Sequence, residues 1–180
     1  MKIYVMRHGT TVWNEKGITQ GRTNNRLSKQ GISLTEQVAL KYKNVKFDVI
    51  YSSPLMRTMQ TSNIMNKYHN IKIIKDQRLI EIDQGIFSGK SKFELTDEEI
   101  TLKFSRSSKC GMESYESVYK RVENFINELK ENTKHKNVLI ITHNVNASFI
   151  ADILNGIDVD FENDTHLRNF KNAEVKCFNI

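Results

Sequence analysis

The sequence is poor in cysteine and in long apolar runs, and each shortage excludes a class of protein. Its two cysteines, Cys110 and Cys177, lie far apart and form no CxxC or cysteine/histidine cluster. Neither a disulfide framework nor a zinc site is therefore expected, and no metal or cofactor is indicated. No apolar run approaches the roughly 20 residues that span a bilayer, and no segment has the pattern of a signal peptide. We expect a cytoplasmic protein with no membrane partner.

Repeats, low-complexity tracts and linkers are also missing from the 180 residues. A chain of this length suits one domain with a single core, so residues 1–180 are expected to form a single domain. The sequence favours no particular oligomeric state.

The net charge of +6 is modest, and the basic residues are scattered. The densest basic stretches, residues 41–46 and 134–136, do not interleave aromatics as a platform for single-stranded nucleic acid would. They are interpreted as solvated surface, and no nucleic-acid partner is expected. The excess of positive charge would still help to attract a small anionic ligand.

Apolar runs and helical patterns alternate along the chain. Strands are expected near residues 2–6, 48–51, 71–74, 138–141 and 174–178. Helices are expected from Ser28, from residues 53–55 to about 68, from 114 to about 131 and from 145 to about 154. This alternation predicts an α/β three-layer sandwich, in which helices cover both faces of a mostly parallel central sheet.

Three local signals refine these boundaries. Ser28 is a candidate N-cap for its helix, and Ser53 is a candidate cap with Pro54, the single proline, at the first helical position. Residues 90–110 have only a weak helical pattern and are interpreted as a surface segment or lid.

Residues suited to phosphate chemistry follow the ends of the expected strands. At the end of the first strand, Arg7 can donate two hydrogen bonds to phosphate, neutral His8 can attack phosphorus, and Gly9 permits a close approach of the backbone.

The later strands are followed by Ser53 and Arg57, by Glu81 and by His143. In open α/β sheets ligands bind beyond the carboxyl ends of the strands, so these side chains are expected to converge on one site.

The same residues carry a resemblance to a known family, the histidine phosphatase superfamily, also called phosphoglycerate mutase-like. It covers nearly the whole chain, and its motifs occur in the family's order. They are Arg7-His8-Gly9-Thr10-Thr11 with Asn14, Gln20-Gly21-Arg22 with Leu27-Ser28 and Gly31, Ser52-Ser53-Pro54-Leu55-Met56-Arg57-Thr58-Met59-Gln60-Thr61, Leu79-Ile80-Glu81 with Gly85 and Gly89, Gly111-Met112-Glu113-Ser114, and Thr142-His143.

The resemblance implies a role for each matching residue. His8 would accept the phosphoryl group, and Glu81 would protonate the leaving alcohol and then deprotonate water. The phosphate pocket would consist of Arg7, Asn14, Arg57 and the catalytic His143, and substrate would also meet Gln20, Gly21 and Arg22. Asp83 is a nearby competitor for the role of Glu81, because the two would face the same side if a strand continued.

The proposed chemistry sets requirements on two pKa values. His8 must be neutral, and nearby cations favour the neutral form. A backbone acceptor for the N–H on its other ring nitrogen would select the tautomer. Glu81 works best with its pKa raised, as burial would do.

The details of the match favour hydrolysis of a small phosphorylated metabolite over mutase chemistry. Mutases of this family typically have Glu-Arg-His-Tyr-Gly around the acid, whereas this chain has Glu-Ile-Asp-Gln-Gly at residues 81–85. Two further departures are Asn144 in place of glycine and Ser88 in place of glutamate.

The small phosphatases, including the α-ribazole phosphatase-like group, are the branch that the chain resembles most. Phosphoglycerate mutase-type transfer is the first alternative. A catalytically weak phospho-ligand or nucleic-acid-binding protein is an alternative from another class, although a binder needs no acid such as Glu81. Substrate specificity is expected to lie in residues 90–112 and near Arg22.

Overall fold

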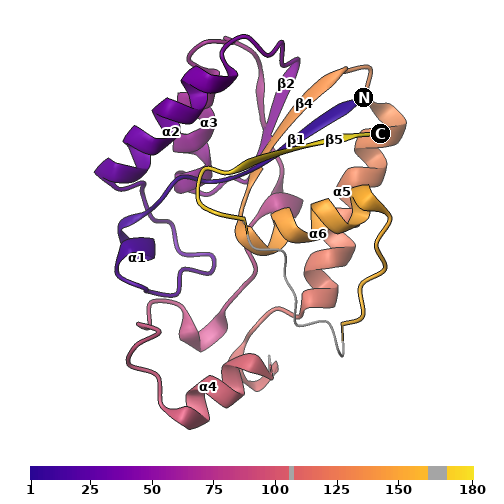
Figure 1. The fold of residues 1–180 in the computed structure, drawn as a ribbon. Helices are drawn as coiled ribbons and strands as arrows, with labels where there is room; N and C mark the ends of the chain where they lie inside the picture. Colours follow the sequence, from indigo (N-terminus) through magenta and orange to yellow (C-terminus); the bar gives the residue numbers. More distant parts are fainter. Residues whose placement is uncertain (106–107, 162–169) are drawn as a thin grey trace.

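The computed structural model describes residues 1–105, 108–161 and 170–180 and has three layers (Figure 1). Within these residues, five strands form one sheet in the order β3-β2-β4-β1-β5. They are β1 (Lys2–Arg7), β2 (Val49–Ser52), β3 (Ile73–Lys75), β4 (Asn137–Thr142) and β5 (Val175–Asn179). The first four are parallel, and β5 runs antiparallel to β1 at the edge. The mostly parallel sheet that the sequence predicts is therefore confirmed.

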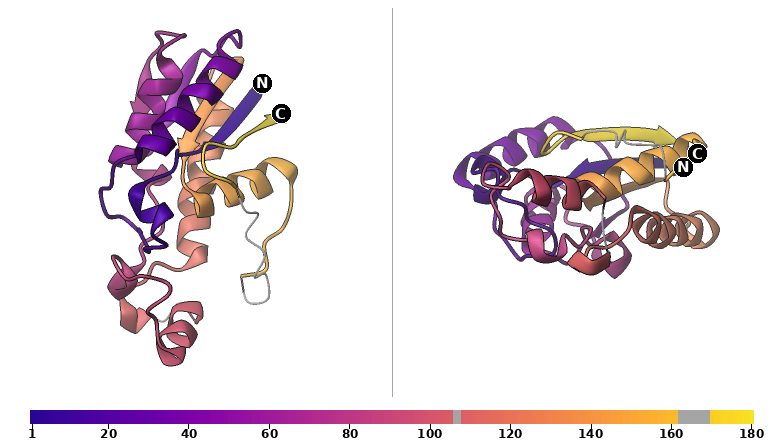
Figure 2. Two further views of the ribbon diagram at one scale, coloured as in Figure 1. Left: turned by 60° about the vertical axis from the view of Figure 1, so that its left-hand side comes forward. Right: turned by 90° about the horizontal axis from the view of Figure 1, so that it is seen from below.

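Helices cover both faces of this sheet. Helices α2 (Lys29–Tyr42) and α3 (Met56–Asn66) pack together on one face, and α5 (Tyr115–Asn132) and α6 (Asn144–Asn155) pack together on the other. The short helix α1 (Val12–Glu15) and helix α4 (Asp97–Phe104) lie outside these layers, and α4 is well separated from the sheet (Figures 1 and 2). Short 3-10 turns occupy Gln77–Leu79, Gly85–Phe87 and Ser108–Cys110.

Alternating side chains of the central strands supply two apolar cores. Ile3 and Val5 of β1 pack with α5 and α6, whereas Met6 packs with α2 and α3. Neighbouring β4 divides in the same way, with Ile140 in the first core and Leu139 in the second. Burial on both faces explains why the parallel strands are nearly continuous apolar runs in the sequence.

Two of the three local signals have clear outcomes. Ser28 caps α2 as predicted, and its hydroxyl accepts a hydrogen bond from the Gly31 N–H. The prediction for Ser53 and Pro54 is wrong, because the N-cap of α3 is Leu55. The Ser53 N–H still donates to the Ile141 carbonyl at 3.1 Å, so the chain leaves the sheet too late for a helix to begin there.

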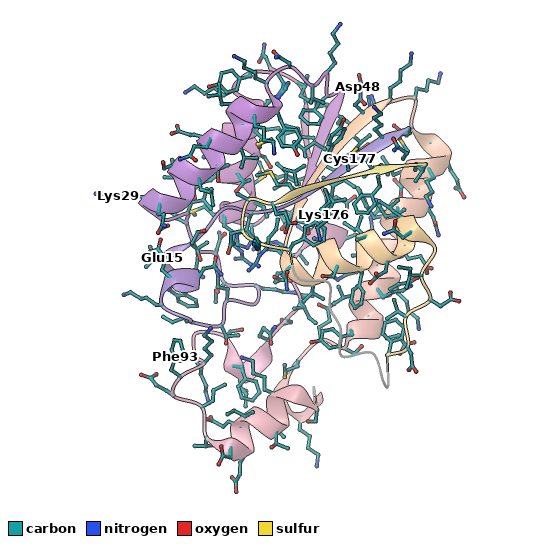
Figure 3. All side chains as sticks on the ribbon, viewed as in Figure 1. Glu15, Lys29, Asp48, Phe93, Lys176 and Cys177 are labelled. Atoms are coloured by element: carbon teal, nitrogen blue, oxygen red, sulfur yellow. The ribbon has the colours of Figure 1, made fainter. Side chains whose placement is uncertain are left out.

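The segment expected to be weakly helical contains α4, which begins at a capping box formed by Thr96 and Glu99. Residues 106 and 107 of this segment lie outside the described part. Phe93, labelled in Figure 3, is 76% exposed on the same outlying segment. In the described ranges, none of the helices combines the length and the apolarity needed to cross a bilayer.

Candidate active site

Two histidines meet at the carboxyl ends of adjacent strands. Strands β1 and β4 pair in parallel up to Arg7 and Thr142, and the residues that follow them are His8 and His143. The His8 N–H continues the pairing by donating to the Thr142 carbonyl at 3.0 Å. The imidazole centroids of His8 and His143 are 5.2 Å apart, and both side chains are buried. The strand pairing thus brings together two residues that are distant in the sequence.

Arg57, in the first turn of α3, bridges the two imidazoles. Its Nε–H lies 3.2 Å from both His8 Nε2 and His143 Nδ1. The other guanidinium nitrogens donate to the carbonyls of Thr23 at 2.7 Å and Gly21 at 2.8 Å. The side chain is fully buried, so backbone carbonyls and imidazoles replace the water that a guanidinium normally binds.

These contacts fix the tautomers of both histidines. Because Arg57 Nε can only donate, His8 Nε2 and His143 Nδ1 must both present lone pairs. The proton of His8 then lies on Nδ1, which donates to the Gly9 carbonyl at 2.7 Å. The proton of His143 lies on Nε2, which donates to the Ser53 hydroxyl at 2.8 Å. A backbone acceptor therefore selects the His8 tautomer, as the sequence predicts.

Burial and neighbouring cations keep both imidazoles neutral. Desolvation lowers the pKa of His8 and of His143 well below the usual 6.5, and the charges of Arg57 and Arg7 lower both further. Desolvation also lowers the pKa of Arg57 to about 10, which leaves this guanidinium charged near neutrality. His8 is therefore neutral at physiological pH and its Nε2 carries no proton, as a nucleophile requires. The hydrogen bond from Arg57 to this nitrogen must be released before it attacks phosphorus.

Arg7 is held over the site from the C-terminal part of the chain. Its NH1 donates to the Phe170 carbonyl at 2.6 Å, and the Phe170 N–H donates to Asn144 Oδ1 at 3.0 Å. Phe170 is fully buried, and Lys176, labelled in Figure 3, lies 4.1 Å over its ring. Asn144, which stands where the family usually has glycine, therefore binds the backbone of Phe170. Among the described residues, the buried Arg7 Nε has no hydrogen-bond partner.

Glu81 lies beside the histidines on a segment with no strand. Its Oε2 is 3.9 Å from His143 Nδ1, and its Oε1 accepts from the Ile82 N–H at 3.0 Å. Desolvation raises the pKa of this carboxyl, in the direction expected for a general acid, although Arg57 opposes the shift. Asp83 is 38% exposed and lies 3.8 Å from Arg22. No strand continues past Glu81, so the two carboxylates do not share a strand face.

The four remaining predicted residues lie around this centre. Asn14 is in the α1 capping box, where its Oδ1 accepts from the Thr11 N–H at 3.0 Å. Gln20 accepts from the Thr11 hydroxyl at 3.0 Å. Gly21 contributes the carbonyl that Arg57 binds, and its positive φ of 50° suits glycine. Arg22 Nε donates to the Glu81 carbonyl at 3.2 Å.

Sequence reasoning assigned no role to two groups that support the site. The Thr61 hydroxyl accepts from the Gly9 N–H at 3.0 Å, and Asn172 donates to the His8 carbonyl at 3.1 Å. Ser53 was expected to converge on the site as well as to cap a helix, and its hydroxyl does accept from His143 Nε2. Thr61 does lie one turn after Arg57 on the helix, a spacing that places both near the same strand end, whereas Asn172 has no signal in the sequence.

The arrangement can bind and transfer a phosphoryl group. Two guanidiniums, two imidazoles and one carboxyl gather where three strand ends meet. The cations complement a phosphate dianion, and phosphoryl transfer depends mainly on positioning and charge stabilisation. Within the described ranges, no cluster of three or more His, Cys, Asp and Glu residues is placed to bind a metal ion.

Comparisons with known proteins define the class of this protein. The chain matches the family model of the histidine phosphatase superfamily (branch 1) over residues 3–180, and it belongs to this superfamily. Phosphoserine phosphatase 1 of Hydrogenobacter thermophilus is 32% identical over 170 residues, which cover 88% of this chain and 78% of that protein. As a member of this superfamily, the chain is an enzyme of the phosphatase class.

Two further relatives widen the comparison. The probable phosphoglycerate mutase GpmB of Proteus mirabilis is 27% identical over 97% of this chain and 84% of its own length. The α-ribazole phosphatase structure from Shigella flexneri superposes with a TM-score of 0.87 at 22% identity, and covers 100% of this chain and 91% of the other. The structural likeness establishes the phosphoglycerate mutase-like fold that the sequence predicts.

Proposed function

We propose that this protein hydrolyses phosphate monoesters of small metabolites through a phosphohistidine formed on His8 Nε2, in one domain spanning residues 1–180. The observation that supports this most is the meeting of two imidazole lone pairs at Arg57 Nε, 3.2 Å from each. This arrangement leaves His8 neutral and protonated on Nδ1, with its unprotonated Nε2 beside the Arg57 guanidinium.

In the first step His8 Nε2 attacks phosphorus while the bond from phosphorus to the ester oxygen breaks. Arg7 and Arg57 stabilise the charge on the transferring group. His143 holds the Arg57 guanidinium in place, because its Nδ1 accepts a hydrogen bond from Arg57 Nε. Glu81 donates its proton to the leaving oxygen, so the alcohol departs neutral. The imidazolium character that develops on His8 is stabilised because its Nδ1–H already donates to the Gly9 carbonyl.

In the second step water attacks the phosphorus of phospho-His8. Glu81, now ionised, accepts a proton from this water, and the bond between Nε2 and phosphorus breaks. Inorganic phosphate leaves, and both His8 and Glu81 return to their starting protonation states. One carboxyl therefore serves as acid and then as base, which requires a pKa above that of an ordinary glutamate.

The substrate is proposed at the level of a small phosphorylated metabolite. O-phosphoserine is the first compound to examine, because a relative with 32% identity is named a phosphoserine phosphatase. Arg22 and Asp83, 3.8 Å apart on the rim beside Glu81, would offer both charge signs to a zwitterionic leaving group. Freedom from nucleic-acid partners and a cytoplasmic location stay predictions from the sequence.

The His8→Ala variant tests the proposal. Phosphate release from p-nitrophenyl phosphate, O-phosphoserine, sugar phosphates and nucleotides should fall to background, while circular dichroism remains that of the wild type. A variant that turns over any of these esters at the wild-type rate would contradict the proposed nucleophile.

Transfer between substrates is the alternative, favoured by the relative named a phosphoglycerate mutase. Incubation with 3-phosphoglycerate and a bisphosphate primer separates the two reactions. Hydrolysis predicts inorganic phosphate as the product, whereas net formation of 2-phosphoglycerate without phosphate release would establish transfer.

A further inference from the structure

The segment that carries Glu81, residues 78–83, is held mainly by side chains of other elements. It belongs to no strand, and four consecutive carbonyl groups each accept a hydrogen bond from a side chain. The pairs are Arg121 NH1 to Arg78 O at 2.5 Å, Thr142 Oγ1 to Leu79 O at 2.8 Å, Asn146 Nδ2 to Ile80 O at 3.0 Å, and Arg22 Nε to Glu81 O at 3.2 Å. The direction of the Glu81 carboxyl therefore depends on these donors.

Two of the four donors are joined by one carboxylate, that of Glu113. Its Oε2 accepts from Arg22 NH2 at 3.1 Å, and its Oε1 accepts from Arg121 Nε at 3.0 Å. Oε2 also accepts from the Asp83 N–H at 3.2 Å. Glu113 thus binds both arginines that hold the ends of the segment and one N–H of the segment itself. We call Arg22, Glu113 and Arg121 the Glu113 clamp.

The clamp is shielded from solvent at its centre. The side chains of Glu113 and Arg121 are 11% and 16% exposed. Burial alone would raise the pKa of Glu113, but hydrogen bonds from Arg121 and the charges of both arginines hold it below its usual value. Glu113 is therefore ionised across the neutral range, and the clamp keeps two positive charges and one negative charge.

We propose that Glu113 is a positioning residue for Glu81: through Arg22 and Arg121 it holds the segment so that the Glu81 carboxyl faces the leaving-group oxygen. The inference rests on the proposed function, because it assigns Glu113 a task only if Glu81 transfers a proton. The contacts of Glu113 described above are with Arg22, Arg121 and the Asp83 N–H, so it acts through the backbone of residues 78–83.

A comparison of leaving groups separates this role from a general contribution to folding. An alkyl leaving group such as methanol must be protonated as it departs, whereas p-nitrophenolate leaves without a proton. Misplacing the acid should therefore slow phosphoryl transfer from methyl phosphate and leave transfer from p-nitrophenyl phosphate nearly unchanged. General acid catalysis contributes about 10²–10⁴-fold, and a misplacement of about 1 Å can cost about 10²-fold.

The experiment measures single-turnover phosphorylation of the enzyme by both esters, using rapid quench. Glu113→Gln should lower the rate with methyl phosphate about 10- to 100-fold and the rate with p-nitrophenyl phosphate less than about threefold. Glu81→Gln should show the same split. Glu116→Gln is the matched control on α5: Glu116 pairs with Lys120 at 2.7 Å on the exposed face, and both rates should stay at the wild-type value.

The double variant Glu81→Gln/Glu113→Gln tests whether Glu113 acts through Glu81. It should be no slower with methyl phosphate than Glu81→Gln alone, because the acid has already been removed. If Glu113→Gln fails to fold, Arg121→Gln removes one arm of the clamp and should show the same split.

Two results would overturn the inference. One is an equal loss with both esters in Glu113→Gln, and the other is a further loss when it is added to Glu81→Gln. Failure of the proposed function gives a different pattern, in which Glu81→Gln itself shows no difference between the two esters.

Discussion

Replacement of Arg57 by methionine should separate catalysis from stability. The guanidinium is fully buried and binds two imidazoles and two carbonyls. Desolvation lowers the pKa of this guanidinium to about 10, and the shift corresponds to a cost of about 3 kcal/mol for keeping the charge buried. Methionine is of similar length and avoids that cost.

The variant also loses interactions. The carbonyls of Gly21 and Thr23 lose their donor, and an unsatisfied buried carbonyl costs about 1–3 kcal/mol. The two contributions largely offset each other, so the free energy of unfolding should fall by at most about 3 kcal/mol. Catalysis has no such compensation, because an arginine that stabilises transferring phosphate is worth about 10³–10⁵-fold in rate.

Urea denaturation and steady-state kinetics with p-nitrophenyl phosphate measure both effects on the same protein. The expected result for Arg57→Met is a folded enzyme with kcat/KM lowered at least about 10³-fold. Arg26→Met is the control and should retain the wild-type kcat/KM, because Arg26 is exposed and its Nε donates to Met56 Sδ, at the start of α3, at 3.1 Å. A folded Arg57→Met protein within tenfold of wild type would refute the role given to Arg57.

The remaining predictions concern packing and pH. Gly31→Ala should destabilise the protein by more than about 2 kcal/mol, because the new Cβ would overlap the Thr10 carbonyl group. This loss outweighs the preference of helices for alanine over glycine, which is about 1 kcal/mol. Thermal unfolding measures the effect, and an unchanged Tm would contradict it. The pKa values of His8 and His143 are held well below 6.5 in the folded state. The unfolded chain therefore binds more protons as pH falls below about 6.5, and stability falls by up to about 1.4 kcal/mol per pH unit for each histidine. Glu81 has a raised pKa, so its titration stabilises the folded protein as pH falls and opposes this loss. The test therefore compares the wild type with His143→Asn, which should lose less stability between pH 7.5 and 5.5. Equal losses of stability in the two proteins would contradict the prediction.

The ends of the central strands could be predicted because each is a readable apolar run. Ile3 to Met6 and Val138 to Ile141 are buried on both faces, so their sequence is continuous and its end is sharp. The residues that follow, Arg7-His8 and Thr142-His143, were therefore placed correctly. That β4 lies between β1 and β2 depends on long-range pairing, which no local pattern contains.

The sequence was misleading where tertiary contacts override a local signal. Ser53 followed by Pro54 has the pattern of a helix start, yet Ser53 stays hydrogen-bonded to the sheet and its hydroxyl serves His143. The segment around Glu81 has no period to detect because side chains from several elements hold it. The Phe170 contact to Arg7 is a backbone carbonyl, which any residue type could supply.

The site of phosphorylation tests the central claim most directly. Rapid denaturation during turnover of p-nitrophenyl phosphate, followed by mass spectrometry and ³¹P NMR, should find an acid-labile phosphoryl group on Nε2 of His8. The His8 Nδ1–H is committed to the Gly9 carbonyl at 2.7 Å, so Nδ1 should not be phosphorylated. Phosphate on His143, on His8 Nδ1, or on no residue while ester hydrolysis proceeds would contradict the account.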